Sequence, residues 1–331
     1  MNTVQGTYGA KPTFSSLIGT SDPSAVGGNE GCFEVISAGP AVSSLKKGDW
    51  VVPATTGFGS WRTHALVEDA DRSLIRVADA TDGLSPLAAA TVSVNPCSAY
   101  RMLRDYVDLI DLSVQGYARG NARGGAWFLQ NGANSGVGRA AIQLGALWGL
   151  RSINVVRARP SAGETEALKA ELAELGATVV VTEEEFLDRG FAHRMKGEWM
   201  DGGREEVMLG LNCVGGASAS QLARCLGAGG TMVTYGAMSK KPVALPTGLL
   251  IFKDLRFRGF WLSRWANADK EGKRRTIEEI LGLVRAGKFK DTPVQEVRWD
   301  WDTEEATLKE AVQGTLQGFR SGKGVFVFGE T

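Results

Sequence analysis

A glycine-rich turn carries the residues with the clearest chemical meaning in this chain. It runs from Asn131 to Gly138 (NGANSGVG), after the apolar segment 126–130 and before the Ala-, Ile- and Leu-rich segment 138–148. Glycine lets the backbone turn tightly and approach a pyrophosphate, which then sits on the N–H groups of a helix N-terminus. Glycines also serve close packing of a helix on a strand, but the strand–turn–helix order favours nucleotide binding over that structural explanation.

Two arginines stand where the second strand of a nucleotide-binding fold should end. Arg157 lies 19 residues after Gly138 and Arg159 follows it, with no carboxylate between 155 and 160. A site for NAD requires Asp or Glu at this point to hold the ribose 2′-hydroxyl, whereas guanidinium groups match a 2′-phosphate. Two solvated arginines on a loop are the alternative, but their position relative to the turn favours NADPH as the cofactor.

The elements that must position these residues alternate between strand and helix through the middle of the chain. This order predicts an α/β fold with a parallel, doubly wound Rossmann sheet, flanked on both sides by a mostly β region. We expect a polar surface loop at 116–125 and a solvated charged face at 273–275. The predicted strands are 48–53, 74–77, 126–130, 152–156, 178–181, 207–211, 231–235 and 324–328, and the predicted helices are 138–148, 163–175, 269–285 and 304–316.

Composition excludes several classes of function. The length of 331 residues favours two domains, and 37 Lys+Arg against 37 Asp+Glu give no reason to expect nucleic acid or an anionic membrane as a partner. No apolar run approaches the roughly 18 residues of a membrane span. Four dispersed cysteines and two histidines lack the spacing of a metal site, so we expect no metal and a small buried thiol at Cys97. No targeting peptide is visible at the N-terminus.

Sequence blocks spread over nearly the whole chain identify a family. They include NTVQGTYG, VGGNEG, VNPCSAYRML, QNGANSGVGRAAIQL, GGTMVTYGAMSK and LLIFKDLRFRGFWLS. These blocks resemble the mitochondrial 2-enoyl thioester (enoyl-acyl carrier protein) reductases of fungi, zinc-free members of the medium-chain dehydrogenase/reductase superfamily. The resemblance implies a GroES-like, mostly β catalytic domain at 1–96 and 262–331, around an NADPH-binding Rossmann domain at 97–261. It also implies a mitochondrial location and a homodimer through the cofactor-domain sheets, with the strand near 256–260 at the edge.

The resemblance further implies which residues form the site. Tyr8 stands at the family's active-site tyrosine, and Trp261 lines the same pocket. Taken alone, Tyr8 is a packing or turn residue and Trp261 a core residue by default. Zinc-dependent relatives carry Gly-His-Glu where this chain has Gly-Asn-Glu at 28–30, so a metal ligand is missing. The positions that match the family's NADPH contacts are Asn95, Asn134, Ser135, Gly136, Val137, Arg157, Ala158, Arg159, Tyr235, Gly236, Ala237, Met238, Phe260, Trp261, Leu262 and Lys323.

The implied activity is the reduction of a trans-2-enoyl thioester, on acyl carrier protein or CoA, in mitochondrial fatty acid synthesis. The substrate Cβ receives a hydride from NADPH, and negative charge develops on the carbonyl oxygen. A tyrosine hydroxyl, with an ordinary pKa of about 10, stays protonated at neutral pH. Tyr8 is therefore expected to donate a hydrogen bond to this oxygen and to protonate Cα, directly or through water.

The N-terminus and the shared cofactor fold leave alternatives. Met1 stands only seven residues ahead of Tyr8, where family members have further strands of the catalytic domain, so we expect an N-terminally short chain. One alternative is a catalytically impaired form that only binds NADPH. A second is a zinc-free NADPH quinone oxidoreductase of the same superfamily, which requires neither Tyr8 nor the RGFWLS block. A third, a methyltransferase, shares the Rossmann layout but expects an acidic residue at position 157.

Overall fold

A computed structural model describes Gly6, Gly9 and residues 11–15, 21–79, 82–118, 125–317 and 322–329. The chain divides into two compact units, the first comprising Met1–Val94 with Ser263–Thr331 and the second Asn95–Leu262. The sequence placed the first boundary after residue 96. The second unit begins at Asn95, the first residue of helix α3, and this helix packs against α5.

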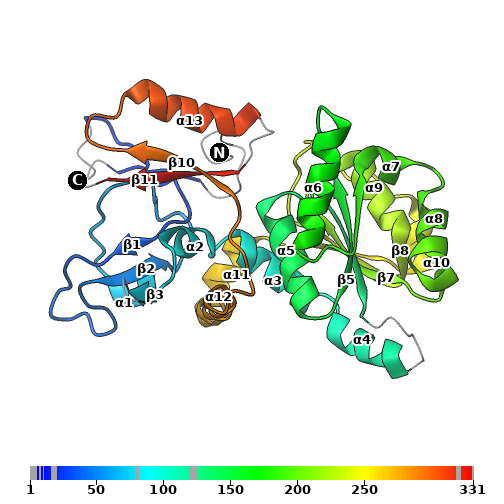
Figure 1. Ribbon diagram of the computed structural model, residues 1–331. Helices are drawn as coiled ribbons and strands as arrows, with labels where there is room; N and C mark the ends of the chain where they lie inside the picture. The colour runs from blue at the N-terminus through cyan, green and yellow to red at the C-terminus, as the bar shows by residue number, and fades with distance from the viewer. Residues whose placement is uncertain are drawn as a thin grey trace. The chain divides into compact units, whose positions relative to one another are not determined.

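The second unit is built on a sheet of six parallel strands, which confirms the predicted Rossmann arrangement (Figure 1). The strand order is β6-β5-β4-β7-β8-β9, so the direction of strand addition reverses between β4 and β7. Ligands of such sheets bind outside the carboxyl ends of the strands at this switch point. The strands are β4 (Trp127–Asn131), β5 (Arg151–Val156), β6 (Val179–Thr182), β7 (Val207–Asn212), β8 (Leu226–Thr234) and β9 (Arg256–Gly259).

Helices cover both faces of this sheet (Figure 1). On one face, α5 and α6 bury Ile142 and Leu172 against the sheet. On the other face, α7, α8 and α9 bury Phe186, Phe191 and Leu222. Because both faces are covered, the central strands of the sheet are buried along almost their whole length. The helices are α3 (Asn95–Asp105), α4 (Leu109–Ala118), α5 (Gly136–Leu147), α6 (Ala162–Glu174), α7 (Glu183–Leu187), α8 (Phe191–Glu198), α9 (Gly216–Cys225) and α10 (Thr247–Lys253), with a 3₁₀ turn at Asp201–Gly203.

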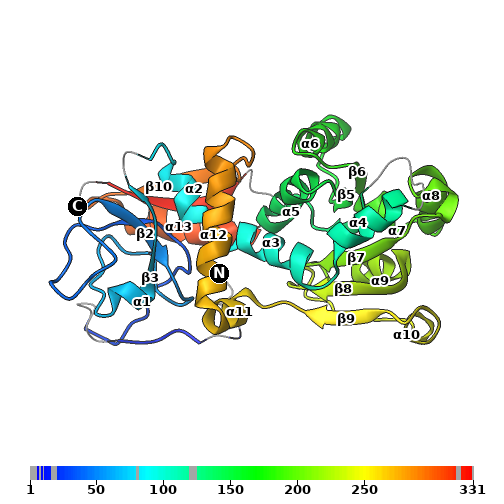
Figure 2. The same ribbon diagram turned by 90° about the horizontal axis from the view of Figure 1, so that it is seen from below.

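One edge of the sheet is formed by β9, as expected for the segment near 256–260 (Figure 2). Among the described residues, β8 is the only strand that pairs with β9. The short helix α10 precedes this strand and exposes Leu250 (48%), Ile251 (67%) and Phe252 (84%). An unpaired strand edge beside exposed apolar side chains is typical of an interaction surface.

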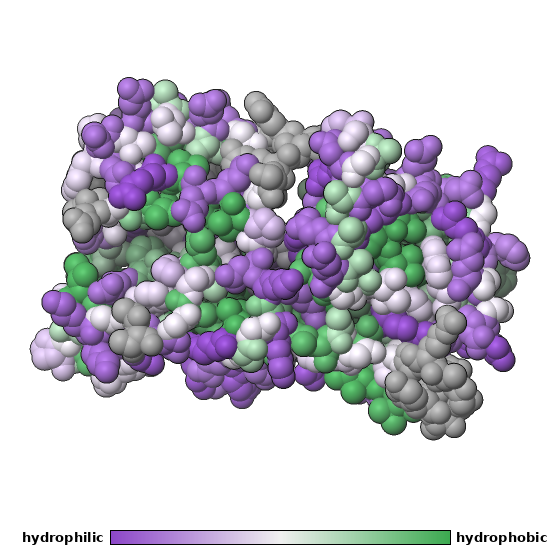
Figure 3. All heavy atoms as spheres, viewed as in Figure 1, coloured by the Kyte–Doolittle hydropathy of each residue, from purple (hydrophilic) through white to green (hydrophobic). Residues whose placement is uncertain are grey.

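Helix α4 shows that the predicted loop at 116–125 was wrong in its first part. The helix continues to Ala118, and residues 119–124 lie outside the described residues. The glycines of this stretch led to the prediction of a loop. The apolar residues before them, however, have the spacing of a helix. Ile110 and Val114 on α4 are exposed, and Figure 3 shows apolar side chains gathered over this helix.

The first unit contains an antiparallel sheet of order β1-β2-β3 and a parallel pair, β10-β11. Helix α12 packs against β3 and α2. The predicted strands at 48–53, 74–77 and 324–328 are confirmed, as are the helices at 269–285 and 304–316. The elements are β1 (Phe33–Glu34), β2 (Asp49–Pro53), α1 (Ala70–Ser73), β3 (Leu74–Asp79), α2 (Pro86–Thr91), α11 (Leu262–Ala268), α12 (Lys270–Arg285), β10 (Val294–Trp299), α13 (Glu305–Gln317) and β11 (Lys323–Phe328).

Lys273 on α12 contradicts the predicted solvated face at 273–275. Its side chain is buried, and its Nζ donates hydrogen bonds to the carbonyl oxygens of Pro53 (2.9 Å) and Ala54 (3.0 Å). Its neighbours Arg274 and Arg275 are exposed, as expected. The prediction failed at Lys273 because one face of α12 packs on the unit, and a cation on that face must be paired.

Candidate cofactor-binding site

Most of the residues expected to contact the cofactor follow the carboxyl ends of parallel strands. The glycine turn follows β4, Arg157 follows β5, Tyr235 follows β8 and Phe260 follows β9. Since the sheet is parallel, these ends lie along one edge of the second unit. The fold therefore brings together side chains that are up to about 130 residues apart in sequence, at the edge where such sheets bind nucleotides.

The glycine turn is closely fitted to its surroundings. A Cβ at Gly136 would stand 2.3 Å from Nδ2 of Asn95, so this amide lies directly against the turn. Gly132 has a φ of 63°, and a Cβ there would stand 2.5 Å from Sγ of Cys213. Ser135 caps α5, its Oγ accepting a hydrogen bond from the Gly138 N–H (3.1 Å). The start of α5 thus has the geometry that presents backbone N–H groups to a phosphate.

A buried amide network behind the turn was not predicted from the sequence. Nδ2 of Asn131 donates to Oδ1 of Asn212 (2.9 Å), and Oδ1 of Asn131 accepts from the Cys213 N–H (2.8 Å). Oδ1 of Asn212 also accepts from the N–H of Gly215 (3.1 Å). The network ties the end of β4 to the end of β7, the two strands at the switch point. An amide residue at the end of each apolar run was its sequence signal.

The arginine segment is tied to the first turn of α6. The Arg159 N–H donates to Oγ1 of Thr165 (2.9 Å), and Ser161 forms a capping box with Glu164. Glu164 is the first carboxylate after β5, and its side chain is engaged in this cap. It therefore does not take the place of the acidic residue that binds the ribose 2′-hydroxyl in NAD sites. The side chain of Arg157 is exposed. The segment that follows β5, residues 157–160, therefore carries positive charge and no carboxylate that would bind a ribose 2′-hydroxyl.

The buried hydroxyl of Tyr235 is a further feature that bears on which ligand the site binds. This hydroxyl is buried beside the side chains of Cys213 and Ser135, and it forms no hydrogen bond of regular geometry with the described residues. Burial, and then the neighbouring Cys213, raise its pKa well above the ordinary value, so the hydroxyl remains neutral. A buried polar atom without a well-formed hydrogen bond is uncommon, and a polar group of a bound ligand would satisfy it. Together with the turn and the arginines, this hydroxyl fits a phosphorylated dinucleotide.

The segment after β9 is held by two contacts. The Phe260 N–H donates to the Thr234 carbonyl (3.0 Å), and Oη of Tyr106 donates to the Gly259 carbonyl (3.1 Å). The rings of Tyr106 and Phe260 meet edge to face. Trp261, a core residue by default from its sequence alone, is 44% exposed. Its indole is thus accessible on the surface of the second unit, as a ligand-contacting residue requires.

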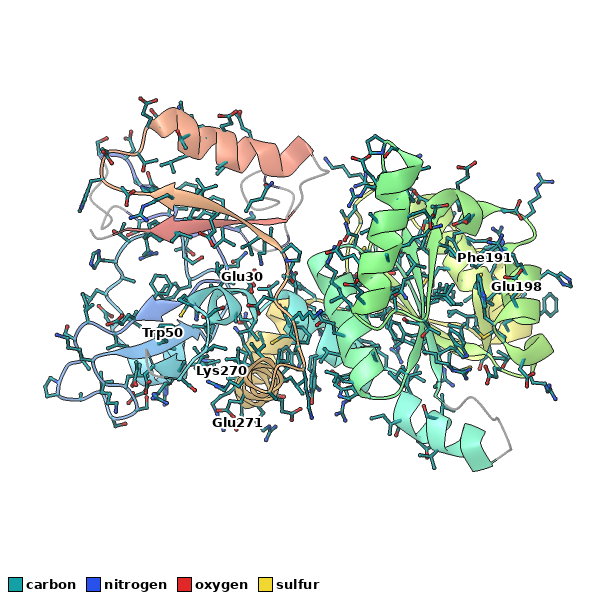
Figure 4. The ribbon with its side chains drawn as sticks, viewed as in Figure 1. Glu30, Trp50, Phe191, Glu198, Lys270 and Glu271 are labelled. Atoms are coloured by element: carbon teal, nitrogen blue, oxygen red, sulfur yellow. The ribbon has the colours of Figure 1, made fainter. Side chains whose placement is uncertain are left out.

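The remaining candidates belong to the first unit. Lys323 of β11 forms an ion pair with Glu30, which is labelled in Figure 4. Burial lowers the pKa of Lys323 to about 8. Asn29, at the position of the missing histidine, accepts a hydrogen bond from the Gly57 N–H (3.0 Å). Tyr8 lies outside the described residues.

Clusters of metal ligands and membrane-spanning helices are absent from the part of the chain that the structure describes. This part contains no cluster of three or more His, Cys, Asp or Glu side chains able to bind a metal ion. In the same ranges, every helix is too short or too polar to cross a bilayer.

Comparisons with known proteins identify the family of this chain. A family model described as zinc-binding dehydrogenase matches residues 136–280. The mitochondrial enoyl-(acyl-carrier-protein) reductase of Yarrowia lipolytica is 50% identical over 294 residues, 89% of this chain and 70% of the relative. A structure of the Etr1p/NADP/crotonyl-CoA complex is 40% identical, with a TM-score of 0.87 over 98% of this chain and 86% of that one. An Etr1p/Etr2p heterodimer from Candida tropicalis is 40% identical, with a TM-score of 0.85 over 96% and 85% of the respective chains. This chain belongs to the family of mitochondrial enoyl-(acyl-carrier-protein) reductases.

Proposed function

We propose that this chain reduces trans-2-enoyl thioesters, on acyl carrier protein or CoA, to saturated acyl thioesters with NADPH. The observation that carries the proposal is the 50% identity to an enoyl-(acyl-carrier-protein) reductase across most of both chains. The similar structure with NADP and crotonyl-CoA supports the same cofactor and substrate class. In this chain, Arg157 and Arg159 in place of an acidic residue support NADPH over NADH.

The cofactor supplies the hydride that Cβ of the substrate accepts. The protein must bind this cofactor on the turn 132–137 and hold its 2′-phosphate at 157–159. Asn95, which lies against Gly136, and the buried hydroxyl of Tyr235 support contacts with the same molecule.

The substrate carbonyl oxygen requires a hydrogen-bond donor as negative charge develops on it. Tyr8 is proposed for this role on the basis of its family block, NTVQGTYG, since the described residues do not include it. The same hydroxyl, directly or through water, delivers the proton to Cα. The exposed indole of Trp261 is proposed to line the acyl or nicotinamide side of the pocket.

The test is NADPH oxidation by the purified chain with a short trans-2-enoyl-CoA, beside NADH and a simple quinone. Turnover with the enoyl thioester and NADPH, with NADH far slower, is the expected result. Turnover with the quinone alone would replace the proposal by the quinone oxidoreductase alternative. Absence of any turnover, with NADPH still raising the melting temperature, would identify the chain as a form that only binds the cofactor.

A homodimer through the edge of the six-stranded sheet is part of the proposal. The edge strand β9 and the exposed Leu250, Ile251 and Phe252 of α10 support it, because a second copy of the same edge would cover both. The Etr1p/Etr2p heterodimer shows that such a relative assembles in pairs. We expect Phe252→Glu to halve the mass measured by light scattering after size exclusion, while Leu66→Glu, at an exposed site of the first unit, does not. An unchanged dimer in Phe252→Glu would place the interface elsewhere.

The relatives are named mitochondrial enzymes, and we propose the same compartment for this protein. The check is protease protection of the endogenous protein in isolated mitochondria. Digestion before the outer membrane is opened would contradict it.

A further inference from the structure

Arg139 on α5 joins the glycine turn to the neighbouring helix α6. Its side chain is buried (8% exposed), although Arg is seldom buried without a partner. Nε donates to Oδ1 of Asn134 in the turn (2.8 Å), and Nη1 and Nη2 donate to the two carboxylate oxygens of Glu171 on α6 (2.8 and 2.9 Å). The guanidinium therefore bridges an amide and a carboxylate.

This bridge determines which way the Asn134 amide faces. A guanidinium has only donors, so the atom that meets Nε must be the carbonyl oxygen of the amide. The NH₂ group of the same amide is then directed away from the guanidinium and can act as a donor at the turn that precedes α5. Without Arg139, the amide could rotate and present its oxygen, which would repel an anionic phosphate.

Glu171 keeps Arg139 in this position. Its bidentate pair fixes the plane of the guanidinium and balances its buried charge. The hydrogen bonds from Arg139 hold the pKa of Glu171 below its ordinary value, and the charge of Arg159 lowers it as well. Glu171 therefore remains ionised at neutral pH, between the turn and the arginine segment.

We infer that Arg139 is a positioning residue that fixes the amide of Asn134 as a hydrogen-bond donor toward a phosphate of the dinucleotide. The inference rests on the proposed contact of Asn134 with NADPH. The competing explanation is that Arg139 only stabilises the packing of α5 against α6 through its pair with Glu171. It predicts that loss of Arg139 lowers stability without a specific effect on cofactor affinity.

The test is a double-mutant cycle between Arg139→Gln and Asn134→Ala, with the Kd for NADPH measured by fluorescence titration. Arg139→Gln is expected to raise this Kd about 3- to 10-fold, the loss expected for one hydrogen bond. In the Asn134→Ala background the same substitution is expected to change Kd less than about twofold. The matched control is Arg151→Gln, which breaks a buried Arg–Glu pair with Glu205 at the amino end of β5. It should lower the melting temperature and leave Kd unchanged.

Two results would overturn the inference. One is an unchanged Kd in Arg139→Gln despite a lower melting temperature, and the other is an equal effect of Arg139→Gln in both backgrounds. Should Arg139→Gln fail to fold, Asn134→Asp tests the same point, because its carboxylate accepts from Arg139 but presents no donor. We expect it to fold and to bind NADPH at least about 3-fold more weakly, and wild-type affinity would refute the donor role. Failure of the unmodified protein to bind NADPH would instead refute the proposed function, and the inference with it.

Discussion

Removal of the buried ammonium of Lys273 should destabilise the first unit. In Lys273→Met the side chain keeps an unbranched apolar stem but loses the group that joins α12 to the end of β2. The carbonyl groups of Pro53 and Ala54 then lose a donor at 2.9 and 3.0 Å. Since the side chain is 3% exposed, water does not readily replace it.

The size of the effect follows from these two contacts. Hydrogen bonds to a charged group contribute about 1.5–3 kcal/mol each. The variant also avoids burying a charge, which offsets part of that loss. We expect a net decrease in the free energy of unfolding of about 2–4 kcal/mol, equivalent to a melting temperature about 5–15 °C lower for a unit of this size.

The measurement is thermal and urea unfolding of the full chain, followed by circular dichroism. Arg275→Met is the matched control, because it removes a cation from the same helix at an exposed position two residues away. We expect the control to stay within about 0.5 kcal/mol of the parent protein. Equal effects of the two substitutions would mean that the contacts of Lys273 with β2 add nothing to stability, and would refute the reasoning.

Three further predictions concern activity. Tyr8→Phe should lower kcat by at least about 100-fold, as expected for loss of a donor to the developing oxyanion, with little change in the Kd for NADPH; an unchanged kcat would remove Tyr8 from the chemistry. Arg157→Ala and Arg159→Ala should each raise KM for NADPH about 10-fold, as expected for the loss of one charge-assisted hydrogen bond, and leave KM for NADH unchanged. The control is Arg189→Ala, at an exposed arginine between α7 and α8, which should alter neither KM. Because the pKa of Lys323 is lowered to about 8, its ammonium loses its proton as the pH rises through that value. KM for NADPH should therefore rise between pH 7 and pH 9 in the parent protein but not in Lys323→Arg, and parallel pH profiles would contradict this role.

The sequence determined the features that depend on local pattern. The alternation of apolar runs and helical segments was sufficient for the parallel sheet, because each element carries its own periodicity. The turn at 131–138 and the arginines at 157 and 159 were recognisable because the motif fixes both residue types and spacing. The roles of Tyr8 and Trp261 came from family blocks, since a lone tyrosine or tryptophan has no local pattern that indicates chemistry.

Only the tertiary structure decided which polar side chains are buried and what they contact. Asn131 and Asn212 are 81 residues apart, and Lys273 and Pro53 are 220 residues apart, so no sequence window contains either pair. Arg139 looks like an ordinary helix-surface residue until α6 brings Glu171 against it. Burial depends on which face of each element another element covers, and this is settled by packing over the whole unit rather than by neighbouring residues.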